Sequence, residues 1–339
     1  MTRRQRAEAA RVARLVAARA WQGALVLLAV SVVTFALLAA AGGDALSELA
    51  ANPMVSERAL REMRRVYGLD RPAPERYALW LSDFARGRMG HSFHFHAPVS
   101  AIIWPRLART LMLAALALAL AWSVALSLGI QAARRPRSLW DRASEVLILA
   151  AASTPRIVLA LAALALAVST SLFPVGGEAE VFSPSRALPA AVVLAVPLVA
   201  LFLAQTRESL RDALSEDFVR VARAKGLGER AVVLRHAMRA ALNPLITIFG
   251  YSLGGVLSGS VVVETVLGWP GLGSLSVEAA RHRDVPLLMA VVMLTATAVL
   301  LGNLVADILL RLNDPRLREE GDRRAAPRPR GDAAAAPTV

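Results

Sequence analysis

Residue types that carry covalent and nucleotide chemistry are scarce in this chain. Lys225 is the only lysine among 39 basic residues, and cysteine is absent from the 339-residue sequence. A Walker A phosphate loop needs a lysine followed by serine or threonine after a glycine-rich turn, whereas Lys225 is followed by Gly226. Without cysteine, there are no disulfides, thiolate metal sites or thiol nucleophiles. The sequence therefore excludes a P-loop ATPase and a cysteine enzyme.

Three histidines lie within six residues, in the run His91-Ser92-Phe93-His94-Phe95-His96. Clustered imidazoles can bind a divalent metal. The run contains no carboxylate, however, and alternating His and Phe also suits an amphipathic strand or a capping loop. Both interpretations stay open. We favour the structural one and predict that His91, His94 and His96 form no required metal site.

Four charged residues lie within or at the ends of long apolar segments: Glu145, Arg156, Glu264 and Asp307. A charge inside a membrane segment indicates function by default. Asp307 and Arg311 have the spacing of a pair at a helix end, whereas Glu264 is the better candidate for lining a gate. An intramembrane hydrolase needs a paired nucleophile and base, but these segments contain isolated acids and no histidine. We therefore predict that the chain is not an enzyme.

The apolar segments determine the fold class. Apolar residues make up 56% of the chain and the mean hydropathy is +0.49, a composition typical of membrane proteins. A helix needs about 20 apolar residues to cross a bilayer. Six such segments are residues 20–43, 110–133, 146–174, 187–206, 240–263 and 285–306. We predict an all-α polytopic membrane protein with six transmembrane helices, the third interrupted by Arg156 and kinked at Pro155.

Arginines are distributed unevenly between the connecting segments. Six precede the first span, four lie between the second and third, seven follow the sixth, and residues 207–239 hold eight basic residues. The short loops on the opposite side carry three, and the eight from Arg58 to Arg88 in loop 44–109 count little because that loop is long. We therefore predict cytoplasmic termini and an outer loop 44–109. The net charge of +13 then reflects the orientation of the chain in the plasma (inner) membrane and the contact of its arginines with anionic lipid. It does not indicate binding to nucleic acid.

The remaining segments are short or lack an apolar pattern. Residues 1–19 form a basic segment, and span 20–43 is too long for the apolar core of a cleaved signal peptide. Within the outer loop, short helices are predicted at 56–67 and 74–84. The tail 313–339 is rich in Arg, Pro and Ala and is predicted to be disordered.

The cytoplasmic segment after the fourth span has the pattern of two short amphipathic helices joined at a glycine. Ser215 is a candidate N-cap, and Phe218, Val221 and Ala222 share one helical face. Gly226 breaks the helix, because glycine adopts the left-handed backbone of a tight corner. The apolar positions of the second helix are Leu227, Ala231, Leu234, Met238 and Leu242. The pattern fits a rigid hook beneath a helical bundle and, equally, a basic loop attracted to lipid.

Three motifs stand out in the chain. Residues 219–247 contain Ala222-Arg223-Ala224-Lys225-Gly226-Leu227, His236, Asn243-Pro244 and Thr247. Residues 254–273 end in Glu264-Thr265-Val266-Leu267-Gly268-Trp269-Pro270-Gly271-Leu272-Gly273. Tyr67-Gly68-Leu69-Asp70-Arg71-Pro72 is followed by Gly90, Ser92 and Arg109-Thr110-Leu111. Over residues 20–315 the chain resembles the permeases of binding-protein-dependent ATP-binding cassette (ABC) importers. Within them it is most similar to the dipeptide, oligopeptide and nickel family. In that family it resembles the subunit with the large first periplasmic loop.

The motifs differ at some positions from those of importers in general, and these differences indicate the subfamily that the chain resembles. Arg220-Val221-Ala222 stands where that pattern has Glu-Ala-Ala, and Arg239 stands where it has a proline. Both differences are usual for the peptide branch. In the outer motif, Gly87-Arg88-Met89-Gly90 replaces the usual Gly-Asp-Leu-Gly.

The resemblance implies a type I ABC importer permease fold and a heteromeric transporter. Two homologous permease subunits would form the pore, two ATPase subunits would bind ATP, and a solute-binding protein would deliver cargo; the chain itself would hold no cofactor. The residues implied in ATPase coupling are Phe218, Arg220, Val221, Ala222, Lys225, Gly226 and Leu227. Pore or gate candidates are Gly254, Gly255, Ser258, Glu264 and Trp269. The cargo would be a peptide or, alternatively, nickel, an opine or a glycoside.

A stand-alone secondary transporter is a remote alternative. Such transporters usually show paired inverted repeats and charged residues at the membrane midplane, and neither pattern is visible in the sequence. The spacings Gly250/Gly254 and Gly255/Gly259 instead indicate close approach of helices, within one chain or against a second permease.

Overall fold

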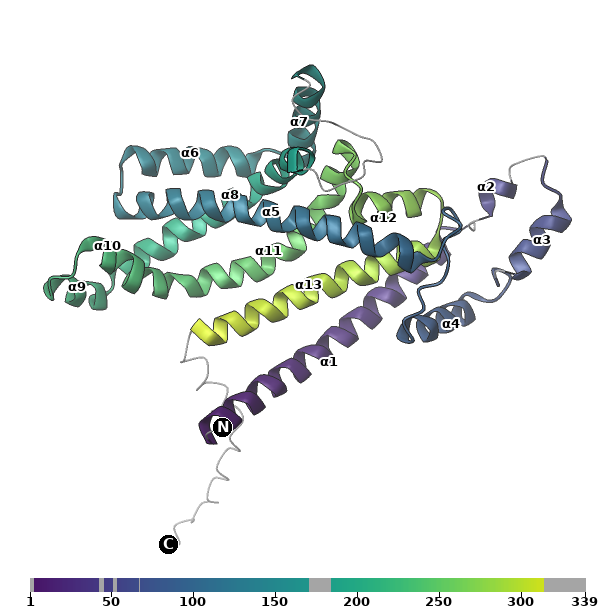
Figure 1. The fold of residues 1–339 in the computed structure, drawn as a ribbon, viewed down its shortest axis with the longest axis horizontal. Coiled ribbons are helices and arrows are strands. Elements are labelled where there is room, and N and C mark those ends of the chain that lie inside the picture. The colour runs from purple at the N-terminus through teal and green to yellow at the C-terminus, as the bar shows by residue number, and fades with distance from the viewer. Residues whose placement is uncertain (1–2, 43–45, 51–53, 67, 171–183, 314–339) are drawn as a thin grey trace, which may run out of the picture.

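The structure is a computed structural model that describes residues 3–42, 46–50, 54–66, 68–170 and 184–313. Within these ranges the chain is helical, and its one β-pairing is an isolated bridge between His91 and Pro98. The long helices run along the longest axis of the molecule, with α9 and α10 at one end and α4 and α12 at the other (Figure 1). The predicted disorder of the tail concerns residues outside the described ranges, apart from Asn313, which ends the last helix.

Five helices are long and apolar enough to cross a membrane. They are α1 (Arg3–Ala40), α5 (Val99–Arg134), α8 (Pro184–Ser215), α11 (Met238–Leu267) and α13 (Val285–Asn313). A sixth span exists if α6 (Leu139–Ser153) and α7 (Arg156–Thr170) are counted together. The predicted all-α membrane fold is therefore confirmed, with the third span as its irregular member.

The third span is broken rather than kinked. The axes of α6 and α7 differ by 96°, and α7 projects sideways from the bundle in Figure 1. Thr154 has extended backbone angles (φ −92°, ψ 118°) because the ring of Pro155 disfavours the helical conformation for the residue before it. The prediction of one long helix was wrong at this point, and its expected end, residues 171–174, lies outside the described ranges.

Helix α8 forms the centre of the bundle against α5, α6, α7 and α11. Alanines 117, 121 and 125 of α5 are fully buried, and the Trp122 ring stacks on Phe202 of α8 with centroids 4.5 Å apart. A Cβ at Gly129 would lie 2.8 Å from Thr206 of α8. Small side chains on α5 therefore let the two backbones approach closely.

The loop predicted to lie outside the membrane contains α2 (Ser47–Ala50), α3 (Glu57–Val66) and α4 (Ala73–Ala85). Both predicted helices in this loop are confirmed, except that Tyr67 lies outside the described residues. Helix α4 contacts α1 through Tyr77, whose hydroxyl lies 2.8 Å from Ser31 Oγ and whose ring lies 5.4 Å from Phe35. Helix α12 (Leu272–Arg281) covers the same end of the bundle.

The segment predicted to be cytoplasmic contains α9 (Asp217–Ala224), α10 (Glu229–Ala231) and a π-helical stretch, η1 (Val232–Ala237), that continues into α11. We call residues 216–237 the hook. Ser215 is the last residue of α8 and its hydroxyl donates to the Asp212 carbonyl, so it does not cap the hook. Glu216, in extended conformation, precedes α9 instead.

Candidate functional site

The corner of the hook is built on Gly226. Its φ of +76° is left-handed, and no atom lies within 4 Å of the place where a Cβ would be. The Gly226 amide donates to the Arg223 carbonyl at 2.9 Å, and the Leu227 amide donates to the Ala222 carbonyl at 3.4 Å, which ends α9. Glycine is therefore required here by the left-handed backbone and not by neighbouring atoms. This left-handed corner was predicted from the sequence.

An ion pair fixes the angle of the corner. Arg223 Nε donates to Glu229 Oε2 at 3.1 Å, and Arg223 Nη2 donates to Glu229 Oε1 at 2.9 Å. This bidentate contact joins α9 to α10 across Gly226, and its hydrogen bonds raise the pKa of Arg223 above the ordinary value. Because both side chains are partly exposed, the pair contributes orientation more than stability.

The buried face of α9 differs from the predicted one. Ala222 is 5% exposed and Val219 is fully buried, and both belong to the apolar cluster at the root of the hook. Phe218 and Val221 are 42% and 53% exposed. Residues three apart share a helical face, so 219 and 222 point inward while 218 and 221 point outward. Ala222 therefore belongs to the root of the hook, and its predicted place on one face with Phe218 and Val221 was wrong.

The second apolar face was also placed wrongly. Leu227 and Leu234 are exposed, whereas the buried residues of this segment are Val232, Val233, Ala237 and Ala241. The inward residues Val233, Ala237 and Ala241 lie one position before the predicted Leu234, Met238 and Leu242, in a segment where η1 departs from α-helical geometry. The outward side chains of the hook include Phe218, Arg220, Val221, Lys225, Leu227 and Leu234.

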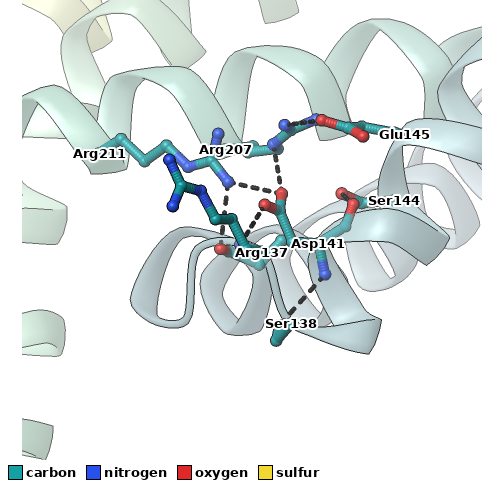
Figure 2. Close-up of polar contacts among 8 residues, drawn as sticks. Arg137, Ser138, Asp141, Ser144, Glu145, Arg207 and Arg211 are labelled. Atoms are coloured by element: carbon teal, nitrogen blue, oxygen red, sulfur yellow. Dashed lines mark hydrogen bonds and ion pairs between the residues drawn. The ribbon is translucent and has the colours of Figure 1, made fainter.

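An ionic cluster around the buried Asp141, not predicted from the sequence, lies between α6 and α8 (Figure 2). Asp141 Oδ1 lies 2.9 Å from Arg207 Nε and accepts from Arg211 Nη2 at 2.5 Å. Its Oδ2 accepts from the Arg137 amide at 2.8 Å. Arg207 also pairs with Glu145. The signal that could have revealed the cluster is the matching i, i+4 spacing of Asp141/Glu145 and Arg207/Arg211.

This ionic cluster connects the hook to the membrane-spanning helices. Arg207 and Arg211 lie on the last turns of α8, and α8 leads through Glu216 directly into α9. Asp141 lies in the first turn of α6, which Ser138 caps by accepting from the Asp141 amide. The cluster therefore ties the end of α8 that leads into the hook to the start of α6.

The C-terminal end of α11, predicted to be the outer one, is organised by Glu264, which is fully buried. Thr110 Oγ1 donates to Glu264 Oε1 at 2.7 Å, and the Ser274 amide donates to Oε2 at 3.0 Å. A Cβ at Gly271 or Gly273 would lie 2.5 Å or 2.8 Å from the Glu264 carboxyl group. Glu264 thus joins α5, α11 and α12 inside the chain, which corrects the prediction that it lines a gate. Trp269, 8% exposed, likewise belongs to the core.

Two of the pore candidates, in contrast, lie on the surface of α11. Gly255 and Ser258 are exposed, whereas Gly254 is half-buried against Val299. Gly255 and Ser258 belong to a stripe of exposed residues at helical spacing, which we call the α11 stripe. Its members are Pro244, Thr247, Tyr251, Gly255, Ser258 and Thr265. Glycine, hydroxyl and phenol groups make this stripe more polar than a lipid-facing surface requires.

The histidines lie apart from both features, at the outer end. The His94 ring stacks on His282 with centroids 3.7 Å apart, and its Nε2 lies 3.4 Å from Glu278 Oε1. His91 and His96 are exposed. The described ranges contain no group of three or more His, Asp or Glu residues arranged to hold a metal. Asp307 has a partner that the sequence did not predict, since its Oδ2 lies 2.7 Å from Arg19 Nε of α1.

Comparison with known proteins identifies the family. Residues 125–319 match the family described as "Binding-protein-dependent transport system inner membrane component", and residues 12–114 match its N-terminal counterpart. The oligopeptide transport system permease protein AppB of Bacillus subtilis is 36% identical over 302 residues, which cover 86% of this chain and 95% of that protein. The dipeptide transport system permease protein DppB of Escherichia coli K12 is 30% identical, with the same coverage.

These matches extend over the hook, the ionic cluster and the α11 stripe. They imply ATPase and solute-binding partners and a multi-pass location in the inner membrane. The chain belongs to the family of binding-protein-dependent transport system inner membrane components and is a membrane permease subunit of an ABC importer.

Proposed function

We propose that this permease imports peptides, forming half of a pore with a second homologous permease above two ATPase subunits. The peptide assignment is supported by the names of its relatives, which are oligopeptide, dipeptide and di/tripeptide permeases. The α11 stripe supplies the surface along which solute passes. Residues 44–109 face the binding protein outside, and both termini are cytoplasmic, as the arginine distribution supports.

The observation that carries the coupling proposal is the contrast between the two faces of the hook. Its inner face is buried in an apolar cluster, while Phe218, Val221 and Leu227 are exposed at the tip. A chain with no P-loop can receive the energy of ATP hydrolysis by mechanical contact with an ATPase subunit. The outward side chains of α9 insert into a cleft of that subunit, and the Gly226 corner and the Arg223–Glu229 pair keep the hook from bending.

Substitution of Val221 tests this proposal. Val221→Glu places an unpaired carboxylate in the contact, and burying such a charge is strongly unfavourable. We expect binding-protein-stimulated ATP hydrolysis by the reconstituted complex to fall by about tenfold or more. Val221→Thr keeps the side-chain shape and is the matched control, with activity within about twofold of the parent. Both variants should still insert and assemble with the second permease, since position 221 is outside the core. Wild-type stimulation in Val221→Glu would contradict coupling through this face.

A further inference from the structure

Arg156 is the one charged residue between Glu145 and Glu178 in the sequence, and it stands at the break between α6 and α7. The 96° turn directs its side chain across the face of α11, where Nη1 donates to the Gly255 carbonyl at 3.1 Å. This hydrogen bond lies on the exposed surface of the chain. A break in an otherwise apolar span thus delivers a guanidinium group to the α11 stripe.

Gly259 provides the space for this guanidinium. A Cβ built at Gly259 would lie 2.6 Å from the Arg156 Cζ, closer than carbon atoms approach without contact strain. The guanidinium is the end of a flexible side chain, so a larger residue at 259 would displace it rather than the helix. Glycine at 259 therefore keeps the charge against α11.

The guanidinium lies at membrane depth. Gly255 is within the charge-free stretch 240–263, and a rise of 1.5 Å per residue puts it about 18 Å from the outer end of α11. The hydrocarbon core is about 30 Å thick, so this position is inside it. A charge held there in contact with lipid is costly, and such residues face a water-filled cavity or a partner of opposite charge.

The charge of Arg156 is not balanced within the described part of the chain. A guanidinium has five N–H donors, and the structure assigns one of them, to a neutral carbonyl. Its neighbours on the α11 stripe, Gly255 and Ser258, carry no charge. Arg156 also begins α7, whose free amide groups and helix dipole add to the positive potential. The site has the electrostatic character of a carboxylate receptor.

We propose that Arg156 binds the carboxylate of the passing solute, the C-terminal carboxylate where the solute is a peptide. The inference rests on the proposed function, because it requires the α11 stripe to face the solute path. A planar guanidinium can accept a carboxylate with two parallel N–H···O bonds while Gly255 and Ser258 leave room for the peptide backbone. The contact replaces part of the hydration that the carboxylate loses on entering the pore.

The test compares peptides that differ by one charge. Proteoliposomes with the assembled complex and its binding protein receive a mixture of di- to pentapeptides as free acids and as C-terminal amides, and uptake is followed by mass spectrometry. The affinity of the binding protein for each peptide is measured separately, and the uptake values are corrected for differences in how well each peptide is delivered. We expect Arg156→Gln to lower free-acid uptake by roughly tenfold and amide uptake by less than about twofold. Arg156→Lys should retain part of the free-acid uptake, and Gly259→Ala should lower it without changing the charge.

Equilibrium binding of tritiated trialanine and of its amide to the complex in nanodiscs needs no delivery step. Wild-type protein should prefer the free acid, and Arg156→Gln should lose that preference. Equal losses for acids and amides would overturn the inference and indicate a contact with an acidic group of the second permease. Unchanged free-acid uptake in Arg156→Gln would overturn it as well. If the wild-type complex imports no peptide of either kind, the proposed function fails instead.

Discussion

The two ends of the helical bundle are fastened by different chemistry. At the outer end, the buried carboxyl group of Glu264 is enclosed by glycines and by short hydrogen bonds from Thr110 and Ser274. At the end that carries the hook, Asp141 is held by two arginines of α8 (Figure 2), and the hook beyond it exposes apolar side chains. Backbone contacts leave the outer end little freedom, whereas ion pairs and an exposed hook suit an end that must bind partners.

The outer end should be the less tolerant of added volume. A Cβ at Gly273 would lie 2.5 Å from the Val261 Cα, a backbone atom that cannot move aside. We expect Gly273→Ala to destabilise the subunit by more than about 3 kcal/mol, measured by thermal unfolding of the purified permease in detergent. Gly255→Ala is the control, since no atom lies within 4 Å of its added Cβ. Similar melting temperatures for the two variants would contradict the account of a close-packed outer end.

The end that carries the hook should respond to loss of charge instead. Asp141→Asn leaves Arg207 and Arg211 without their shared carboxylate in a largely buried site, and we expect a loss of about 3 kcal/mol. Glu145→Gln removes a more exposed carboxylate from the same cluster and should cost less than about 1 kcal/mol. Urea unfolding of each variant in detergent measures the difference. Equal effects would show that burial of Asp141 does not set the strength of the cluster.

The sequence predicted those parts of the fold that depend on composition. Long apolar segments between arginines identified the five long spanning helices, because the bilayer imposes their length. The break at Pro155 was predicted only as a kink, since a proline does not determine how far the next helix turns. That angle is set by the packing of α7 on α8 and α11.

Prediction of the site succeeded for backbone geometry and failed for side-chain direction. Gly226 was identified because a left-handed corner has a residue preference. Ala222 was assigned to the wrong face because the sequence allows it to share a face with either Phe218 or Val219, and packing against Val232 and Val233 selects Val219. Glu264 was expected at a gate because a sequence shows that a charge lies in a span, but not that Thr110, far away in the chain, encloses it.

The most direct test of the central claim is cysteine crosslinking between the hook and the ATPase subunit, which the absence of native cysteine makes specific. Val221→Cys, exposed on the tip, should crosslink to an ATPase subunit carrying single cysteines along its membrane-facing cleft. Val219→Cys, fully buried two residues away, should not react. Nucleotide binding should change the yield at 221, because closure of the ATPase subunits moves the cleft against the hook. Absence of crosslinking at 221 throughout the cleft, in an assembled and active complex, would contradict the account.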